Sequence, residues 1–190
     1  APRDAGELEY MLHSAVEYPG PVAIRYPRAA VESAPWITST AGWGEGEILK
    51  EGSQGMVLAV GSMVLPSLRV ARALSKEGLD IGVCDVRFVK PLPTDLILDL
   101  VRRHNRLITV EDHALAGGFG SAVLELVSEA AMGIPIKRLG IKDRFIEQAS
   151  RQEQLKLCGL DEQNLTTCFH NYFSLSQNRK ELKASDGRDN

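Results

Sequence analysis

Two arginines three residues apart are the side chains whose chemistry stands out first. Arg25 and Arg28 flank the end of "VAIRY", a short apolar run that Pro27 stops and that is typical of a buried strand. A buried guanidinium is costly unless it is paired with an anion. Its planar fork suits groups that accept two parallel N–H bonds. The pattern therefore predicts an anionic partner at the end of this strand.

A glycine cluster lies between a predicted strand and a predicted helix. Gly117, Gly118 and Gly120 stand in "EDHALAGGFGSAVLE", where free backbone N–H groups can bind a phosphate. The G-G-F-G spacing differs from G-x-G-x-x-G, and no P-loop lysine follows. We favour a tight turn with close helix–strand packing, with Phe119 as a contact residue at a surface or subunit interface. A site for a small ligand or anion is the alternative.

Charged residues close two further predicted strands. Glu111, Asp112 and His113 stand at the carboxyl end of a strand, where open α/β sheets bind ligands. A histidine beside two acids can transfer protons, but nothing else converges on it, so we favour a hydrogen-bonded loop or interface. Asp85 and Arg87 share one strand face, which predicts an ion pair between them.

The loop "KDRFIEQAS" holds Asp143, Arg144 and Glu147, for which we predict a salt-bridged loop or a subunit contact. No nucleophile motif, metal-binding motif or paired-carboxylate arrangement is present, so the residues alone predict no catalytic group and no metal ligand. The three cysteines are far apart, which indicates reduced thiols in a reducing compartment.

The rhythm of apolar runs predicts the domain organisation. Residues 1–30 form a lone helix–strand unit, capped by Asp4 and Glu7, that we interpret as the end of an upstream domain. Residues 31–45 read as a linker. Strands alternate with helices over 46–175, which predicts a three-layer α/β/α domain on a mostly parallel sheet, its last helix fading near Ser174. Residues 176–190 are polar and are expected to be disordered.

Composition excludes several classes of function. The 190-residue chain has a net charge of −3, which gives no sign of a nucleic-acid partner. No apolar run approaches the roughly 20 residues of a membrane-spanning helix, and no signal peptide is recognisable. The chain does not begin with methionine, so we expect a fragment or a processed product.

Five stretches taken together resemble the C-terminal part of the 1-deoxy-D-xylulose-5-phosphate synthase family. Their order and spacing agree from Asp4 to about Leu165: "GPVAIRYPR", "AVGSMVLPSLRVARAL", "VRFVKPLPTDLIL", "TVEDHALAGGFGSAVLE" and "RLGIKDRFIEQASRQEQLKLCGLD". Transketolase and the β subunits of 2-oxo acid dehydrogenases share the glycine turn. The blocks "AIRYPR" and "DRFIEQAS" are similar to the synthases instead.

The resemblance implies a thiamine-diphosphate- and Mg²⁺-dependent enzyme that condenses pyruvate with glyceraldehyde 3-phosphate and releases CO₂, supplying isoprenoid and thiamine synthesis. The family's cofactor ligands lie upstream, so this part binds no cofactor and is expected to be inactive alone. The second arginine of "RYPR", Arg28, corresponds to the family's substrate-phosphate ligand, with an interdomain salt bridge as the alternative. Arg25 is then a structural pair within the strand.

The resemblance also implies partners and a location. These are the upstream domains of the same enzyme, a second copy in a homodimer, and the cytoplasm or a plastid stroma. Two rival functions remain open: a stand-alone module for dimerisation or regulation, and the β-subunit end of a 2-oxo acid dehydrogenase. Ala29 stands where the family usually has glycine, and His113 where it often has asparagine. The first change is expected to stiffen the turn beside Arg28.

Overall fold

The computed structural model describes residues 1–37 and 41–185, with side chains described as far as Ser174. Its centre is a five-stranded sheet in the order β1-β3-β2-β4-β5. Only β1 runs antiparallel to its neighbour, so the sheet is mostly parallel, as the sequence predicted. The strands are β1 (Glu47–Lys50), β2 (Met56–Ala59), β3 (Gly82–Asp85), β4 (Leu107–Ala114) and β5 (Ile136–Ile141).

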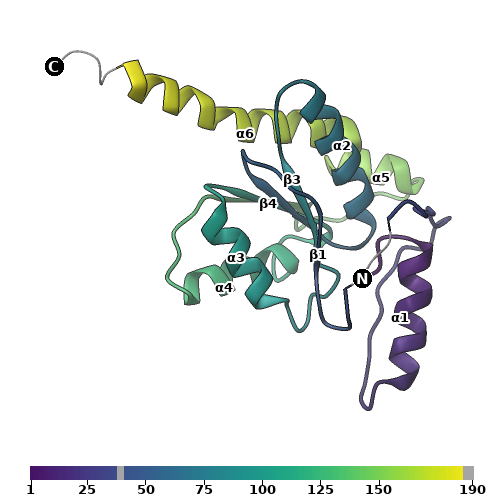
Figure 1. Ribbon diagram of the computed structural model, residues 1–190. Helices are drawn as coiled ribbons and strands as arrows, with labels where there is room; N and C mark the ends of the chain where they lie inside the picture. Colours follow the sequence, from purple (N-terminus) through teal and green to yellow (C-terminus); the bar gives the residue numbers. More distant parts are fainter. Residues whose placement is uncertain (38–40, 186–190) are drawn as a thin grey trace.

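Helices cover both faces of this sheet and complete the predicted three layers (Figure 1). The long helices α2 and α6 pack on one face, and α3 and α4 pack on the other. The helical elements are α1 (Ala5–Glu17), the short 3-10 helix η1 (Gly61–Met63), α2 (Val64–Lys76), α3 (Thr94–Arg103), α4 (Phe119–Glu129), α5 (Arg151–Leu157) and α6 (Glu162–Ser185).

The central strand β2 explains why the apolar runs are continuous. All four of its residues are buried, because a parallel strand between two helical layers is covered on both faces. Val57 and Ala59 contribute to the core beneath α2 and α6, whereas Met56 and Leu58 contribute to the core beneath α3 and α4. The alternation follows from the two-residue period of a strand.

Phe119 belongs to the core beneath α3 and α4, where only 2% of its surface is exposed. The expectation of a surface or subunit contact is therefore wrong for this residue. The sequence pattern placed it at a turn, but Phe119 is the first residue of α4, and its side chain turns inward onto the sheet side of that helix. Among the described phenylalanines, the fully exposed one is Phe145, at 104%.

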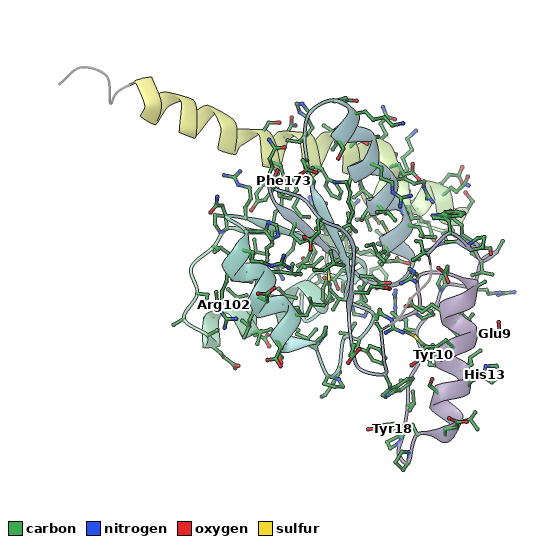
Figure 2. All side chains as sticks on the ribbon, in the orientation of Figure 1. Glu9, Tyr10, His13, Tyr18, Arg102 and Phe173 are labelled. Carbon is green, nitrogen blue, oxygen red and sulfur yellow. The ribbon has the colours of Figure 1, made fainter. Side chains whose placement is uncertain are left out.

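The N-terminal unit lies beside the α/β/α domain rather than within it (Figure 1). Asp4 caps α1 by accepting a hydrogen bond from the backbone N–H of Glu7, as the sequence predicted. Figure 2 shows Glu9 and His13 on the side of α1 that faces away from the domain, with Tyr10 on the nearer side. The Arg87 guanidinium lies 5.5 Å from the Tyr10 ring centre, so this helix contacts the domain through its Tyr10 side.

The predicted strand in residues 22–26 is not formed. The segment is extended, but within the described residues it pairs with no strand, and most of its residues are exposed. The apolar pattern indicated the local shape correctly, because extended backbone satisfies it. A strand also needs a hydrogen-bonding neighbour, and the five strands of the sheet are paired only with one another.

The linker is held at several points. The Ala5 N–H donates to the Glu32 carbonyl at 3.1 Å, and Arg69 on α2 forms an exposed ion pair with the Glu32 carboxylate at 2.6 Å. Trp43 lies between two rings, with centroids 5.7 Å from Tyr18 and 5.2 Å from Phe88. Packing between these rings therefore holds the linker at Trp43, whereas Trp36 is 59% exposed.

Helix α6 is longer than the sequence predicted, since it continues past Ser174 to Ser185. The expected disorder of 176–190 is thus wrong for 176–185, and 186–190 lie outside the described residues. The stretch "KELKA" at 180–184 consists of residues with high helix propensity, which continue a helix that is already nucleated. The polar composition that suggested disorder is equally compatible with a solvated helix.

Candidate functional site

The polar side chains of the domain gather at the carboxyl ends of β2 and β4. These neighbouring strands lead into helices on opposite faces of the sheet, α2 on one side and α4 on the other. Loops that diverge in this way leave a crevice, and open α/β sheets bind ligands at such switch points. Ser62 follows β2, and Glu111, Asp112 and His113 close β4.

Asp112 is the centre of the contacts at this crevice. It is 7% exposed, and its Oδ2 lies 2.5 Å from an Arg151 Nη2. The Ser62 hydroxyl donates to the same oxygen at 3.3 Å and accepts from Arg151 at 2.9 Å. Arg151 begins α5, whose N-cap Ser150 forms a complete capping box that fixes the start of the helix. Asp112 therefore joins the loop after β2 to the start of α5.

Arg25 reaches the same residue from the extended segment. Its Nη2 donates to the backbone carbonyl of Asp112, and the Asp112 carboxylate lies 4.0 Å from the guanidinium. The partner of Arg25 is thus Asp112 of β4 and not a residue of the segment that carries Arg25. Two guanidinium groups share one carboxylate here, which leaves this corner of the crevice with a positive charge.

Arg28 has a different environment. It is exposed and makes no hydrogen bond or ion pair with the described part of the chain. Lys90 and His113 are also exposed, and together with Arg25 they line a cavity of about 720 Å³ between the extended segment and the domain. Of the lining residues, Arg25 is held by Asp112. Arg28 is not a lining residue, and its exposed guanidinium has no partner within the described part of the chain.

Glu111 determines what the glycine turn does. Its carboxylate accepts the N–H of Phe119 at 2.7 Å and of Gly120 at 2.8 Å, which are donors of the first turn of α4. Burial raises the pKa of Glu111, and these two N–H bonds oppose that rise. These two N–H groups are occupied by the protein's own carboxylate and are not available to a bound phosphate, which favours the packing role of the turn. The alternative of a small-ligand or anion site stays a prediction.

The glycines are required by close packing. A Cβ on Gly118 would lie 2.1 Å from the Ala114 carbonyl oxygen and 2.3 Å from a Glu111 Oε, and one on Gly120 would lie 2.6 Å from the Thr109 hydroxyl. These distances are far below van der Waals contact, so the predicted packing role of the turn is confirmed. His113 is exposed, and within the described residues its ring makes a hydrogen-bond contact with the neighbouring Ala114 carbonyl, at 3.4 Å, which supports the loop role that we favoured.

A second polar cluster is buried where α1 meets the domain. Arg3 contacts the carboxylates of Asp4, Glu7, Glu47 and Asp85 at 2.8–3.3 Å. The Arg87 Nε donates to Glu7 at 2.6 Å, and its Nη1 donates to the carbonyls of Ala41, Gly42 and Glu45. This buried ion cluster joins the N-terminal unit, the linker and β3.

The predicted ion pair between Asp85 and Arg87 is wrong, because each side chain pairs with a different residue. Asp85 accepts the backbone N–H of Arg87 at 3.0 Å, but its ion pair is with Arg3. Arg87 lies beyond the end of β3 with φ +59°, so the strand periodicity that predicted a shared face does not apply to it. The left-handed backbone turns its side chain toward Glu7, which only the folded N-terminal unit brings near.

The loop 142–149 forms no salt bridge of the predicted kind within the described residues. Arg144 donates instead to the Leu157 carbonyl of α5 at 3.0 Å, and Asp143 stays exposed. Across the described residues, no three His, Cys, Asp or Glu side chains are placed to hold a metal ion.

Comparison with known proteins identifies the family. Residues 44–165 match the model described as the transketolase C-terminal domain, so the chain belongs to the transketolase C-terminal domain family. It is similar to a solved structure titled "Split gene transketolase, inactive beta4 tetramer", with a TM-score of 0.78 and 31% identity. That match covers 92% of this chain and 57% of the other chain.

Curated relatives indicate the particular branch. The chain is 46% identical over 169 residues to 1-deoxy-D-xylulose-5-phosphate synthase 1 of Geobacter metallireducens and 43% identical over 183 residues to the synthase of Syntrophus aciditrophicus. These matches cover 87% and 93% of this chain but only 27% and 28% of the relatives. The chain therefore corresponds to a C-terminal portion of such a synthase.

None of its described helices is long and apolar enough to cross a membrane.

Proposed function

We propose that this chain is the C-terminal part of a 1-deoxy-D-xylulose-5-phosphate synthase. The single observation that carries the proposal is the 46% sequence identity to such an enzyme over 87% of the chain. In the reaction, the carbonyl carbon of pyruvate loses CO₂ and bonds to the aldehyde carbon of glyceraldehyde 3-phosphate, with uptake of one proton. Thiamine diphosphate, held with Mg²⁺ by the upstream part, supplies the activation of pyruvate.

The proposed contribution of this chain is recognition of the acceptor's phosphate by Arg28. The exposed guanidinium has no partner among the described residues, which supports this role. Arg28 also follows three residues after Arg25, which lines the cavity together with Lys90 and His113. A phosphate dianion accepts two parallel N–H bonds from one guanidinium, which fixes its orientation as well as its distance. An interdomain salt bridge for Arg28 is the alternative, and it has no partner among the described residues.

The remaining proposals concern assembly. The upstream domains of the enzyme are expected to cover the N-terminal unit, where Leu12 and Val16 of α1 are 48% and 88% exposed. We expect a homodimer in the cytoplasm, as the family resemblance implies. A structural neighbour is described as a tetramer, which supports self-association but not a particular number of subunits. That neighbour is also described as inactive, which favours the second candidate, an assembly module without catalysis of its own.

Two preparations test the proposal. The purified 190-residue chain, with thiamine diphosphate and Mg²⁺, is expected to form no product from pyruvate and glyceraldehyde 3-phosphate. A chimera in which this chain replaces the matching part of the Geobacter metallireducens synthase is expected to be active. Arg28→Ala in the chimera should lower kcat/KM for glyceraldehyde 3-phosphate by roughly 30-fold or more, as for loss of a buried charged partner. Product from the isolated chain, or a folded but inactive chimera, contradicts the proposal.

A further inference from the structure

We propose that Arg25 is a positioning residue for Arg28, and that Asp112 of the α/β/α domain anchors it. The inference rests on the proposed role of Arg28 in binding phosphate. It assigns the C-terminal domain a part in substrate recognition that requires no contact with the substrate. The observation behind it is a juxtaposition: Arg25, on the otherwise unpaired segment, contacts the most connected residue of the crevice.

The extended segment has few other attachments. Residues 21–27 pair with no strand in the described part of the chain, and no backbone hydrogen bond is made by their N–H groups. The apolar side chains of Val22 and Ile24 line the cavity of about 720 Å³ together with Val60 and Phe119 of the domain. The cavity therefore lies between these segment side chains and the domain. The contact between Arg25 and Asp112 is therefore the polar link that crosses this gap.

Asp112 is suited to be the fixed end of that link. It is buried, and its carboxylate is already held by Arg151 at 2.5 Å and by Ser62 at 3.3 Å. Its backbone carbonyl belongs to β4, the longest strand of the sheet. Arg25 is half exposed, with 52% of its side chain accessible, so it is the less enclosed end of the link. Contact with Asp112 transfers the rigidity of the sheet to the segment.

The residues between the two arginines carry this constraint to Arg28. Pro27 fixes its own φ near −65°, and a residue that precedes proline, here Tyr26, is restricted to extended backbone. Once Arg25 is held, few backbone freedoms remain before Arg28. Without the anchor, a phosphate that binds Arg28 must also order the segment, and ordering a long side chain weakens binding by about threefold to tenfold.

The first test measures the anchor in the 190-residue chain without any ligand. Backbone ¹⁵N relaxation of the Tyr26 and Arg28 amides should show order parameters that fall below about 0.6 in Arg25→Ala, the range of flexible backbone. Arg25→Lys should recover part of the order, because it keeps the charge but not the fork. Arg102→Ala is the matched control, since this exposed arginine of α3 (Figure 2) makes no contact with the segment. Unchanged order in Arg25→Ala overturns the proposal.

The second test uses the active chimera and separates positioning from binding. Arg25→Ala should raise KM for glyceraldehyde 3-phosphate about threefold to tenfold and change kcat for the same substrate less than KM. In the Arg28→Ala background the Arg25 substitution should have no further effect on KM, because the group it positions is gone. Additive effects of the two substitutions overturn the proposal.

The two failures are distinguishable. If Arg28→Ala leaves KM unchanged, the phosphate role of Arg28 fails, and the positioning role fails with it even where the relaxation data confirm the anchor. If Arg28→Ala raises KM but Arg25→Ala does not, the phosphate role stands and only the positioning role is wrong. Asp112→Asn should give a smaller rise than Arg25→Ala, since it keeps the backbone carbonyl that accepts from Arg25.

Discussion

Asp85 shows how one buried residue can depend on several others. It is completely buried, and the ion cluster around it holds four carboxylates, those of Asp4, Glu7, Glu47 and Asp85, against two guanidinium groups. Burial raises the pKa of Asp85 to about 7, the Glu7 charge adds to the rise, and the bond from Arg3 opposes it. Burial is therefore the main physical reason that the pKa of this carboxyl is raised, and the neighbouring Glu7 carboxylate is the second.

This shift predicts a pH dependence of stability. Because the folded-state pKa of Asp85 is raised above its ordinary value of 3.8, the folded state binds more protons than the unfolded state between about pH 4 and pH 7. Its contribution to the free energy of unfolding should therefore fall as pH rises through this window. We expect the difference in Tm between the wild type and Asp85→Asn to decrease from pH 4 to pH 7. A difference that is constant or increases with pH contradicts the assignment.

At the scale of an element, the start of α4 depends on the absence of a side chain. Gly118→Ala places a methyl group 2.1 Å from the Ala114 carbonyl oxygen, so the turn or the helix must move. We expect a loss of about 1–3 kcal/mol in the free energy of unfolding, the usual cost of overpacking, measured by urea denaturation.

Gly133→Ala is the matched control for this turn, because a Cβ there meets nothing within 4 Å. Its effect should stay within about 0.5 kcal/mol. Equal losses for the two variants would show that the cost comes from glycine substitution in general and not from the contact between β4 and α4.

At the scale of the whole molecule, the buried ion cluster attaches the N-terminal unit to the domain. Glu7 accepts from both Arg3 and Arg87, so Glu7→Ala leaves buried guanidinium groups without their shared carboxylate. Breaking a buried ion pair costs about 3–5 kcal/mol. In this protein α1 can detach from the domain instead, so the loss of stability cannot exceed the free energy of detaching α1. We expect faster amide hydrogen exchange in residues 5–17 and little change in β2 and β4, measured by mass spectrometry or NMR.

The exposed pair between Arg103 and Asp99 provides the comparison for this prediction. Its side chains are 41% and 52% exposed, so Arg103→Ala should change stability by no more than about 1 kcal/mol and leave exchange in α1 unaltered. Global acceleration of exchange in Glu7→Ala, including the central strands, contradicts the idea that the cluster acts as a local attachment.

The sequence by itself determined the main domain. Continuous apolar runs such as Met56–Ala59 are required when helices cover both faces of a parallel sheet, and the alternation with amphipathic helices leaves little choice of architecture. Local signals were equally reliable where the chemistry is local. The cap at Asp4, the capping box at Ser150 and the close packing of Gly118 all involve residues near one another in the chain.

Only the tertiary structure decided the partners of the charged residues. Asp85 and Arg87 are neighbours in sequence, yet their carboxylate and guanidinium pair with Arg3 and Glu7, more than 70 residues away, because a left-handed backbone at Arg87 redirects its side chain. Arg25 meets Asp112 across 87 residues for the same kind of reason. Charge attraction is neither directional nor local along the chain, so a sequence identifies which groups need partners, and the fold selects which partners they obtain.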